Sequence, residues 1–259
     1  MPEYKIKPIV LVITEADKSG FTYMAFAGTK MLLDVAVFLI EGTPNKSGRV
    51  VVDTGTYAAS MAKYWPGKAE DVKSFEDALK EEGMTVDDVD IIIHTHLHHD
   101  HCVNTSKCRN ADVYVQEEEW AFAMAPHPIQ AQYYPKEIYE GWKLRLIRGD
   151  YELFPGLRIL HTPGHTPGTQ SLAVQTKRGT AVIPGMCSIY QTFQNPSKVL
   201  GENHSFGHWE VFSQAIATDM NQSYWSNYRL KSVADVLYPC HGPGFCDKKR
   251  TYVNMYVDM

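Results

Sequence analysis

Short apolar runs separated by turn-forming residues fill the first third of the chain. Residues 35–41 are largely apolar, residues 42–47 have turn chemistry, and Arg49–Val52 is again apolar apart from its first residue. Runs of this length between Gly, Pro, Asn and Ser are typical of β-strands. Residues 89–93 end in three consecutive isoleucines, which indicates a strand that is covered on both faces. The pattern therefore predicts a buried sheet in this part of the chain.

Helical and strand-like patterns alternate along the rest of the chain. Ser74 and Asp77 have the spacing of an N-terminal capping box, and Gly83 ends the apolar stripe that follows, so a helix is expected between them. Two further helices are expected at residues 209–219 and 223–234. The remaining apolar runs predict strands at residues 111–115, 144–147, 157–160, 171–175, 181–183 and 236–238. Helices and strands in this mixed order indicate an α/β architecture in layers rather than a helical bundle or an all-β sandwich.

Length, charge and cysteine content limit the classes of protein to which the chain can belong. The 259 residues are enough for a large core, and no linker-like tract interrupts them, so one domain spanning residues 1–259 is expected. A net charge of -5 without a basic stripe argues against nucleic acid as a partner. The longest apolar stretch, residues 31–40, is shorter than the ~20 residues of a membrane span. Five cysteines, an odd number, and the lack of a secretory signal pattern favour a cytoplasmic protein.

Histidines gather directly after the isoleucine run. The chain has 11 histidines, and four of them, His96, His98, His99 and His101, lie within the motif His96-x-His98-x-Asp100-His101. A loop that leaves the end of a strand can turn several side chains toward one point. Imidazole and carboxylate groups are the usual ligands of zinc and similar metals. The motif is therefore a candidate metal-binding loop.

Two histidines further along the chain provide matching ligands. His165 lies in a repeated His-Thr-Pro-Gly sequence, and His241 lies between Cys240 and Gly242. Both follow predicted strands, and the Gly and Pro residues around them fix the shape of their loops. An incidental histidine-rich surface loop would lack such partners, and an expression tag would stand at a terminus. The combination predicts a metal site.

Together with the Asp-Thr-Gly sequence at residues 53–55, these motifs resemble the metallo-β-lactamase superfamily. The segment from residue 149 to residue 172 is most similar to the quorum-quenching N-acyl homoserine lactonases of that superfamily. The resemblance spans residues 35–241 and implies an α/β fold, a four-layered αββα sandwich of the metallo-β-lactamase type, with the site at one edge of two packed sheets. It also implies two metal ions, the first held by His96, His98 and His165 and the second by Asp100, His101 and His241.

One position departs from the pattern of the family. The aspartate that bridges the two metals there is replaced by Cys187, while Tyr190 keeps the place of a functional tyrosine three residues later. Since thiolate is a preferred zinc donor, we expect Cys187 to be a metal ligand. Both metal ions are expected to be divalent, with zinc preferred over iron, manganese or cobalt. The alternative is that Cys187 is a small buried side chain beside a weaker second site.

The resemblance implies hydrolysis of a lactone, with N-acyl homoserine lactones as the expected substrates. Two neighbouring cations lower the pKa of a shared water, and the resulting hydroxide attacks the ester carbonyl. Tyr190 is expected to donate a hydrogen bond to the developing oxyanion, and Asp100 to carry a proton to the leaving group. His99 stands where lactonases often have an aromatic pocket residue, and we expect it to contact the substrate. Asp53 is expected to order the metal loop through hydrogen bonds.

Other functions share parts of this pattern. A thioesterase or a β-lactam hydrolase would use the same hydroxide and differ only in the substrate pocket. A flavodiiron-type reductase would carry a glutamate at the position of His98 and is therefore disfavoured. If Cys187 abolishes the second site, a non-hydrolytic metal-binding protein is the remaining alternative. We expect a small-molecule substrate as the partner, and a homodimer is left open.

Overall fold

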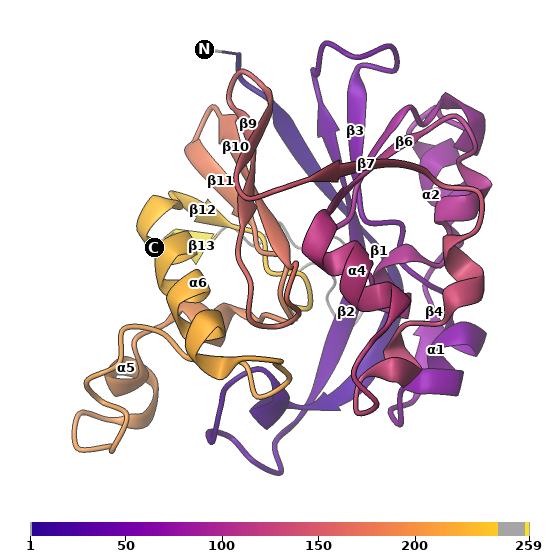
Figure 1. The fold of residues 1–259 in the computed structure, drawn as a ribbon. Coiled ribbons are helices and arrows are strands. Elements are labelled where there is room, and N and C mark those ends of the chain that lie inside the picture. Colours follow the sequence, from indigo (N-terminus) through magenta and orange to yellow (C-terminus); the bar gives the residue numbers. More distant parts are fainter. Residues whose placement is uncertain (1, 243–256, 259) are drawn as a thin grey trace.

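Two β-sheets form the centre of the fold (Figure 1). The computed structural model describes residues 2–242 and 257–258. The first sheet has the strand order β4-β1-β2-β3-β5-β6-β7. Its strands are β1 (Lys5–Asp17), β2 (Lys30–Glu41), β3 (Arg49–Val52), β4 (Ala69–Asp71), β5 (Ile91–Ile93), β6 (Asp112–Gln116) and β7 (Lys143–Ile147). The strands from β4 to β3 are paired antiparallel, whereas β3, β5, β6 and β7 run parallel to one another.

The second sheet has the strand order β13-β12-β11-β10-β9-β8. Its strands are β8 (Tyr151–Phe154), β9 (Leu157–His161), β10 (Gln170–Thr176), β11 (Gly179–Ile183), β12 (Val236–Leu237) and β13 (Val257–Asp258). The pairing is antiparallel except between β11 and β12, which run parallel. The strands predicted in this half of the chain are thereby confirmed.

Side chains of the first sheet alternate between two hydrophobic clusters. In β5, Ile92 packs toward the helices of the first half of the chain, whereas Ile91 and Ile93 pack against the second sheet. In β2, Leu39 and Ile40 are divided between the two clusters in the same way. Successive side chains of a strand point to opposite faces, so a strand that is buried on both faces has a continuous apolar sequence. The prediction that β5 is covered on both faces is confirmed.

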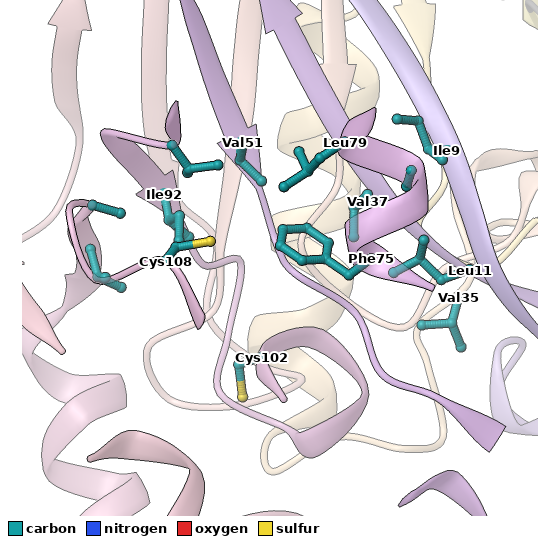
Figure 2. Packing of buried hydrophobic residues seen from close by; sticks show 14 of the residues in the cluster. Ile9, Leu11, Val35, Val37, Val51, Phe75, Leu79, Ile92, Cys102 and Cys108 are labelled. Carbon is teal, nitrogen blue, oxygen red and sulfur yellow. The ribbon is translucent and has the colours of Figure 1, made fainter. Parts of the chain in front are cut away.

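Helices cover the outer faces of the two sheets. α2 (Phe75–Glu81) packs Phe75 and Leu79 onto the first sheet (Figure 2). α6 (Met220–Val233) packs Leu230 onto the second sheet. The other helices are α1 (Ala58–Tyr64), α3 (His99–Cys102), α4 (Glu117–Met124) and α5 (Pro196–Leu200), and short 3-10 helices lie at Lys18–Gly20, Val86–Asp88, Thr105–Lys107, Ala131–Tyr133, Lys136–Tyr139 and Tyr190–Phe193. The four layers confirm the predicted α/β fold, an αββα sandwich.

Two of the three predicted helices are present, and their ends have the expected chemistry. At the start of α2, Ser74 Oγ accepts a hydrogen bond from the Asp77 N–H at 3.0 Å, and Gly83 after the helix has a φ of +69°. The helix predicted at residues 223–234 is α6, which begins at residue 220 because the Asp219 side chain caps it.

The helix predicted at residues 209–219 is wrong, since this segment is irregular. Its backbone groups bond to distant parts of the chain instead of to one another. The N–H of Phe212 donates to the carbonyl of Thr192, and the N–H of Ala215 donates to the carbonyl of Gly20. Such long-range partners satisfy the backbone as well as a helix would, and sequence periodicity does not reveal them.

Loops that follow β5, β9, β11 and β12, together with the short helix α3, carry the residues that the sequence analysis gives as candidate metal ligands. These loops come from both sheets, so the packing of the sheets decides how close their side chains lie. Within the described ranges, no helix has the length and apolar character that a membrane crossing requires.

Candidate metal centre

Loops from both sheets bring six donor side chains together in two groups. Within each group, the candidate donor atoms lie within 4.8 Å of one another. The first donor group consists of His96, His98 and His165, and the second donor group consists of Asp100, His101 and His241. Only Asp100 is partly exposed, and the five histidines are buried. The structure therefore assembles all six side chains that the resemblance implies as histidine and aspartate ligands.

Short distances between donor atoms mark each group. Nε2 of His96 lies 3.2 Å from Nε2 of His165. In the second donor group, Asp100 Oδ2 lies 3.4 Å from Nε2 of His101 and 3.8 Å from Nε2 of His241. Two ring nitrogens only 3.2 Å apart, such as those of His96 and His165, need a proton or a cation between their lone pairs.

Three ring nitrogens of the two groups have no hydrogen-bond partner among the described residues. They are the buried Nε2 atoms of His98, His101 and His241. A buried polar atom without a partner costs about 1–3 kcal/mol. Three such atoms within the two groups fit a bound metal, because ring nitrogens of this kind are zinc ligands in proteins.

Burial keeps the histidines of the first donor group neutral. It lowers the pKa of His96 and His98 well below the usual value and that of His165 to about 4. A neutral imidazole has a free lone pair for a metal. In the second donor group, burial also disfavours charge, but neighbouring carboxylates, Asp100 first among them, outweigh it and raise the pKa of His101 to about 9. The carboxylates around His101 thus stabilise positive charge in the second donor group.

Backbone carbonyls behind the donors fix the orientation of two rings. His165 Nδ1–H donates to the carbonyl of Ile216 at 2.6 Å, and His241 Nδ1–H donates to the carbonyl of Asp34 at 3.0 Å. Because the proton of each neutral ring is at Nδ1, the lone pair of Nε2 faces the donor group. Neither contact could be expected from the sequence, because every residue has a backbone carbonyl.

Asp53 holds the histidine-rich loop from behind. Its Oδ2 accepts hydrogen bonds from His101 Nδ1–H and from the Thr95 hydroxyl, each at 2.8 Å, and its Oδ1 accepts one from the Thr95 N–H at 2.8 Å. Burial alone would raise the pKa of this carboxyl, but the charge on His101 outweighs it and lowers the pKa to about 2. The φ of +56° is a left-handed conformation that Asp adopts more easily than most residues. The expectation that Asp53 orders the metal loop is confirmed.

Cys187 and Tyr190 are placed differently relative to the donors. Cys187 is half-buried, its Sγ lies 3.5 Å from Nε2 of His165, and burial raises the pKa of its thiol well above the usual value. A thiolate at this position therefore needs a neighbouring cation. Tyr190 is half-buried at the start of a 3-10 helix, and in the part of the chain that the structure describes no hydrogen bond or ring contact joins it to the donors. The roles of both residues stay predictions.

Two small cavities lie beside the donors and share part of their walls. Asp100 and Cys187 line both cavities together with Met61, Trp65 and Ile216. A few polar groups at one side of an otherwise apolar wall are typical of a site for a small organic ligand. The donors thus face two small cavities whose walls combine apolar side chains with the Asp100 carboxylate.

His99 forms part of the wall of one of these cavities. It is buried, and its ring centroid lies 4.6 Å from that of Tyr64 and 6.4 Å from that of Tyr133. Burial lowers the pKa of His99, so its ring is neutral. Its Nδ1 atom has no hydrogen-bond partner among the described residues. His99 therefore adds a hydrogen-bonding atom to an aromatic wall, and its contact with the substrate stays a prediction.

Comparisons relate the chain to known proteins. The model of the metallo-beta-lactamase superfamily matches residues 32–185. An N-acyl homoserine lactonase of Bacillus sp. is 32% identical over 193 residues, which cover 69% of this chain and 74% of the relative. The crystal structure of a quorum-quenching N-acyl homoserine lactone lactonase matches with a TM-score of 0.75 at 25% identity, over 99% of each chain. A second solved structure, an N-acyl homoserine lactone hydrolase with N-hexanoyl-L-homoserine at its catalytic metal center, matches with a TM-score of 0.75 at 24% identity, over 99% of this chain and 100% of that one.

Proposed function

This chain belongs to the metallo-beta-lactamase superfamily, and on that basis we propose that it is a metal-dependent hydrolase that opens lactones. The proposed substrates are N-acyl homoserine lactones, because the relative of Bacillus sp. and the solved structure at 25% identity are lactonases of that class. The observation that carries the proposal is the pair of donor groups beside an apolar cavity. The proposed biological role is quorum quenching.

Each donor group would hold one divalent ion through its carboxylate or ring nitrogens. When bound, the two ions supply a water of lowered pKa as nucleophile and an electrophile for the carbonyl oxygen. We propose zinc as the metal, because Cys187 would add a thiolate to the histidine donors. The distance of 3.5 Å between Cys187 Sγ and His165 Nε2 supports a shared ion.

The side chains around the cavities would bind the substrate and move its protons. Asp100 lines both cavities, so its carboxylate can take a proton from the attacking nucleophile and pass it to the leaving alkoxide. Tyr190 would donate a hydrogen bond to the developing oxyanion. His99 would donate or accept a hydrogen bond on the acyl side of the substrate, while Met61 and Trp65 contact its apolar part and exclude water.

The proposed setting is the cytoplasm, with residues 1–259 as one hydrolase domain. A small molecule is the proposed partner, and the net charge of -5 without a basic stripe is consistent with a substrate that is not a nucleic acid.

A hydrolysis panel on protein of known metal content tests the proposal. Protein purified without added metal is analysed for its elements, and close to two metal ions per chain are expected. Lactones, thioesters and β-lactams are then compared by acid release at constant pH, and lactones should be opened fastest. His98→Ala should lose metal and activity together. His127→Ala, which changes an exposed histidine, is the matched control and should keep both.

Two results would contradict the proposal at different levels. Brisk cleavage of a thioester or a β-lactam without turnover of any lactone would exclude the lactonase and leave the metal-dependent hydrolase. A chain without bound metal, whose activity is indifferent to strong chelators, would exclude the metal-dependent hydrolase itself.

A further inference from the structure

A carboxylate on helix α4 is buried close to the first donor group. Glu119 has no exposed surface and accepts four hydrogen bonds. At Oε1 the donors are the Leu97 N–H (2.9 Å) and the Tyr134 hydroxyl (3.1 Å), and at Oε2 they are the Thr166 hydroxyl (2.6 Å) and the Gly168 N–H (3.1 Å). Burial raises the pKa of this carboxyl, and no ion pair within the described ranges includes it. Only its hydrogen bonds offset the lost hydration.

Three of these four donors belong to the loops that carry the first donor group. Leu97 lies between His96 and His98, and Thr166 directly follows His165. One carboxylate therefore bonds the loop after β5 through one oxygen and the loop between β9 and β10 through the other. The two loops come from different sheets, so this contact joins the two halves of the first donor group.

The Leu97 backbone is held on both sides. Its N–H donates to Glu119, and its carbonyl accepts a hydrogen bond from the Tyr139 hydroxyl at 2.7 Å. Peptide units are planar, so fixing the N–H and the carbonyl of one residue restrains both of its backbone rotations. The directions of the histidine side chains on either side of Leu97 thus depend on groups outside the loop.

Gly168 allows helix α4 to approach the second loop closely. A Cβ atom at this position would lie 2.2 Å from the backbone nitrogen of Glu119, which no side chain could tolerate without a shift of the backbone. The first turn of α4 therefore rests directly on the loop of His165. This contact places the Glu119 carboxylate within reach of both loops.

We propose that Glu119 is a positioning residue of the first donor group. It sets the spacing between the pair His96 and His98 and the third donor, His165, and thereby the affinity of the group for metal. The inference rests on the proposed function only in that this group binds a metal. Lactone turnover does not enter the test, so the two proposals can fail separately.

Glu119→Gln tests the proposal with little change in shape. In either orientation, the amide NH2 faces one backbone N–H, that of Leu97 or that of Gly168, so one loop loses its hydrogen bond. Metal-free protein is loaded with Co²⁺, its affinity is measured by competition with a chelator, and its visible spectrum is recorded. We expect about a 10- to 100-fold loss of Co²⁺ affinity and a changed spectrum. Glu118→Gln, on the same helix with a side chain that is 68% exposed, is the control and should match the wild type.

Tyr139→Phe is a second, milder variant. It removes only the hydroxyl that bonds the Leu97 carbonyl, and about a two- to tenfold loss of Co²⁺ affinity is expected. Two folded variants with the affinity and the spectrum of the wild type would overturn the proposal. A lower unfolding temperature of metal-free Glu119→Gln with unchanged Co²⁺ affinity would also overturn it, because the role would then be structural only. A wild type that binds no Co²⁺ would overturn both this inference and the proposed function.

Discussion

The sulfur of Cys187 lies 3.5 Å from Nε2 of His165, at the side of the first donor group. The same cysteine lines both cavities beside the donors together with Asp100. It thus lies beside one histidine of the first donor group and faces the same cavities as the carboxylate of the second. The resemblance to the family implies that this is the place of the aspartate that bridges two metals, and we therefore predict a shared ligand here.

We predict that Cys187→Ala loses mainly one of the two metal ions, whereas Cys187→Asp restores an ordinary bridging site. The reason is that alanine removes a donor, while aspartate replaces the thiolate by a carboxylate. Elemental analysis of each variant measures the effect, with Cys108→Ala, a thiol buried in the hydrophobic core, as the control. Oxidants should inactivate the wild type and spare Cys187→Asp. Unchanged metal content and rate in Cys187→Ala would show that the side chain only packs.

We predict that Asp53→Asn weakens metal binding by about 10- to 100-fold. Asparagine has nearly the same shape and tolerates the left-handed backbone at this position, so the change removes mainly the charge that faces His101 Nδ1. Competition with a chelator measures the loss. Asp87→Asn, at an exposed site, should have no effect. Equal affinities in the two variants would show that Asp53 orders the loop without influencing the metal.

We predict that Tyr190→Phe slows lactone opening by about 10- to 100-fold, which corresponds to roughly 1.4–2.7 kcal/mol. The lost hydroxyl would otherwise stabilise the developing oxyanion together with a metal. The effect should be in kcat, and the metal content should stay the same, because the hydroxyl is not proposed as a ligand. Tyr228→Phe, which changes an exposed tyrosine on α6, is the control. If Tyr190→Phe opens lactones as fast as the wild type, Tyr190 has no role in this reaction.

We predict that His99→Phe changes substrate preference rather than the chemical step. The ring keeps its place between Tyr64 and Tyr133 but loses the nitrogen that has no partner within the described protein. One lost hydrogen bond should lower kcat/KM for N-acyl homoserine lactones with a polar acyl substituent by about two- to tenfold, relative to plain acyl chains. Measuring both substrates on both proteins gives this ratio. An unchanged ratio would show that His99 does not contact the acyl chain.

Several features of the fold could be predicted because they depend on neighbours in the sequence. The capping contact between Ser74 and Asp77 spans three residues, and the apolar run of β5 reflects burial on both faces. The strand β1 was not among the predicted strands, although its residues 8–13 are mostly apolar. The helix expected at residues 209–219 is absent because the backbone N–H groups of this segment donate hydrogen bonds to Gly20, Thr192 and other distant residues.

The sequence by itself determined which side chains can be metal donors. His96, His98, Asp100 and His101 lie within six residues directly after a strand, and His165 stands among glycines and prolines, so a local pattern is sufficient. Apart from Asp53, which was expected from the sequence, only the tertiary structure decided what holds these donors in place. The supports are carbonyls and a carboxylate on distant elements, namely those of Ile216, Asp34 and Glu119. A carbonyl is common to all residues, and a glutamate in a run of three has no distinguishing spacing, so their roles arise only when the two sheets pack.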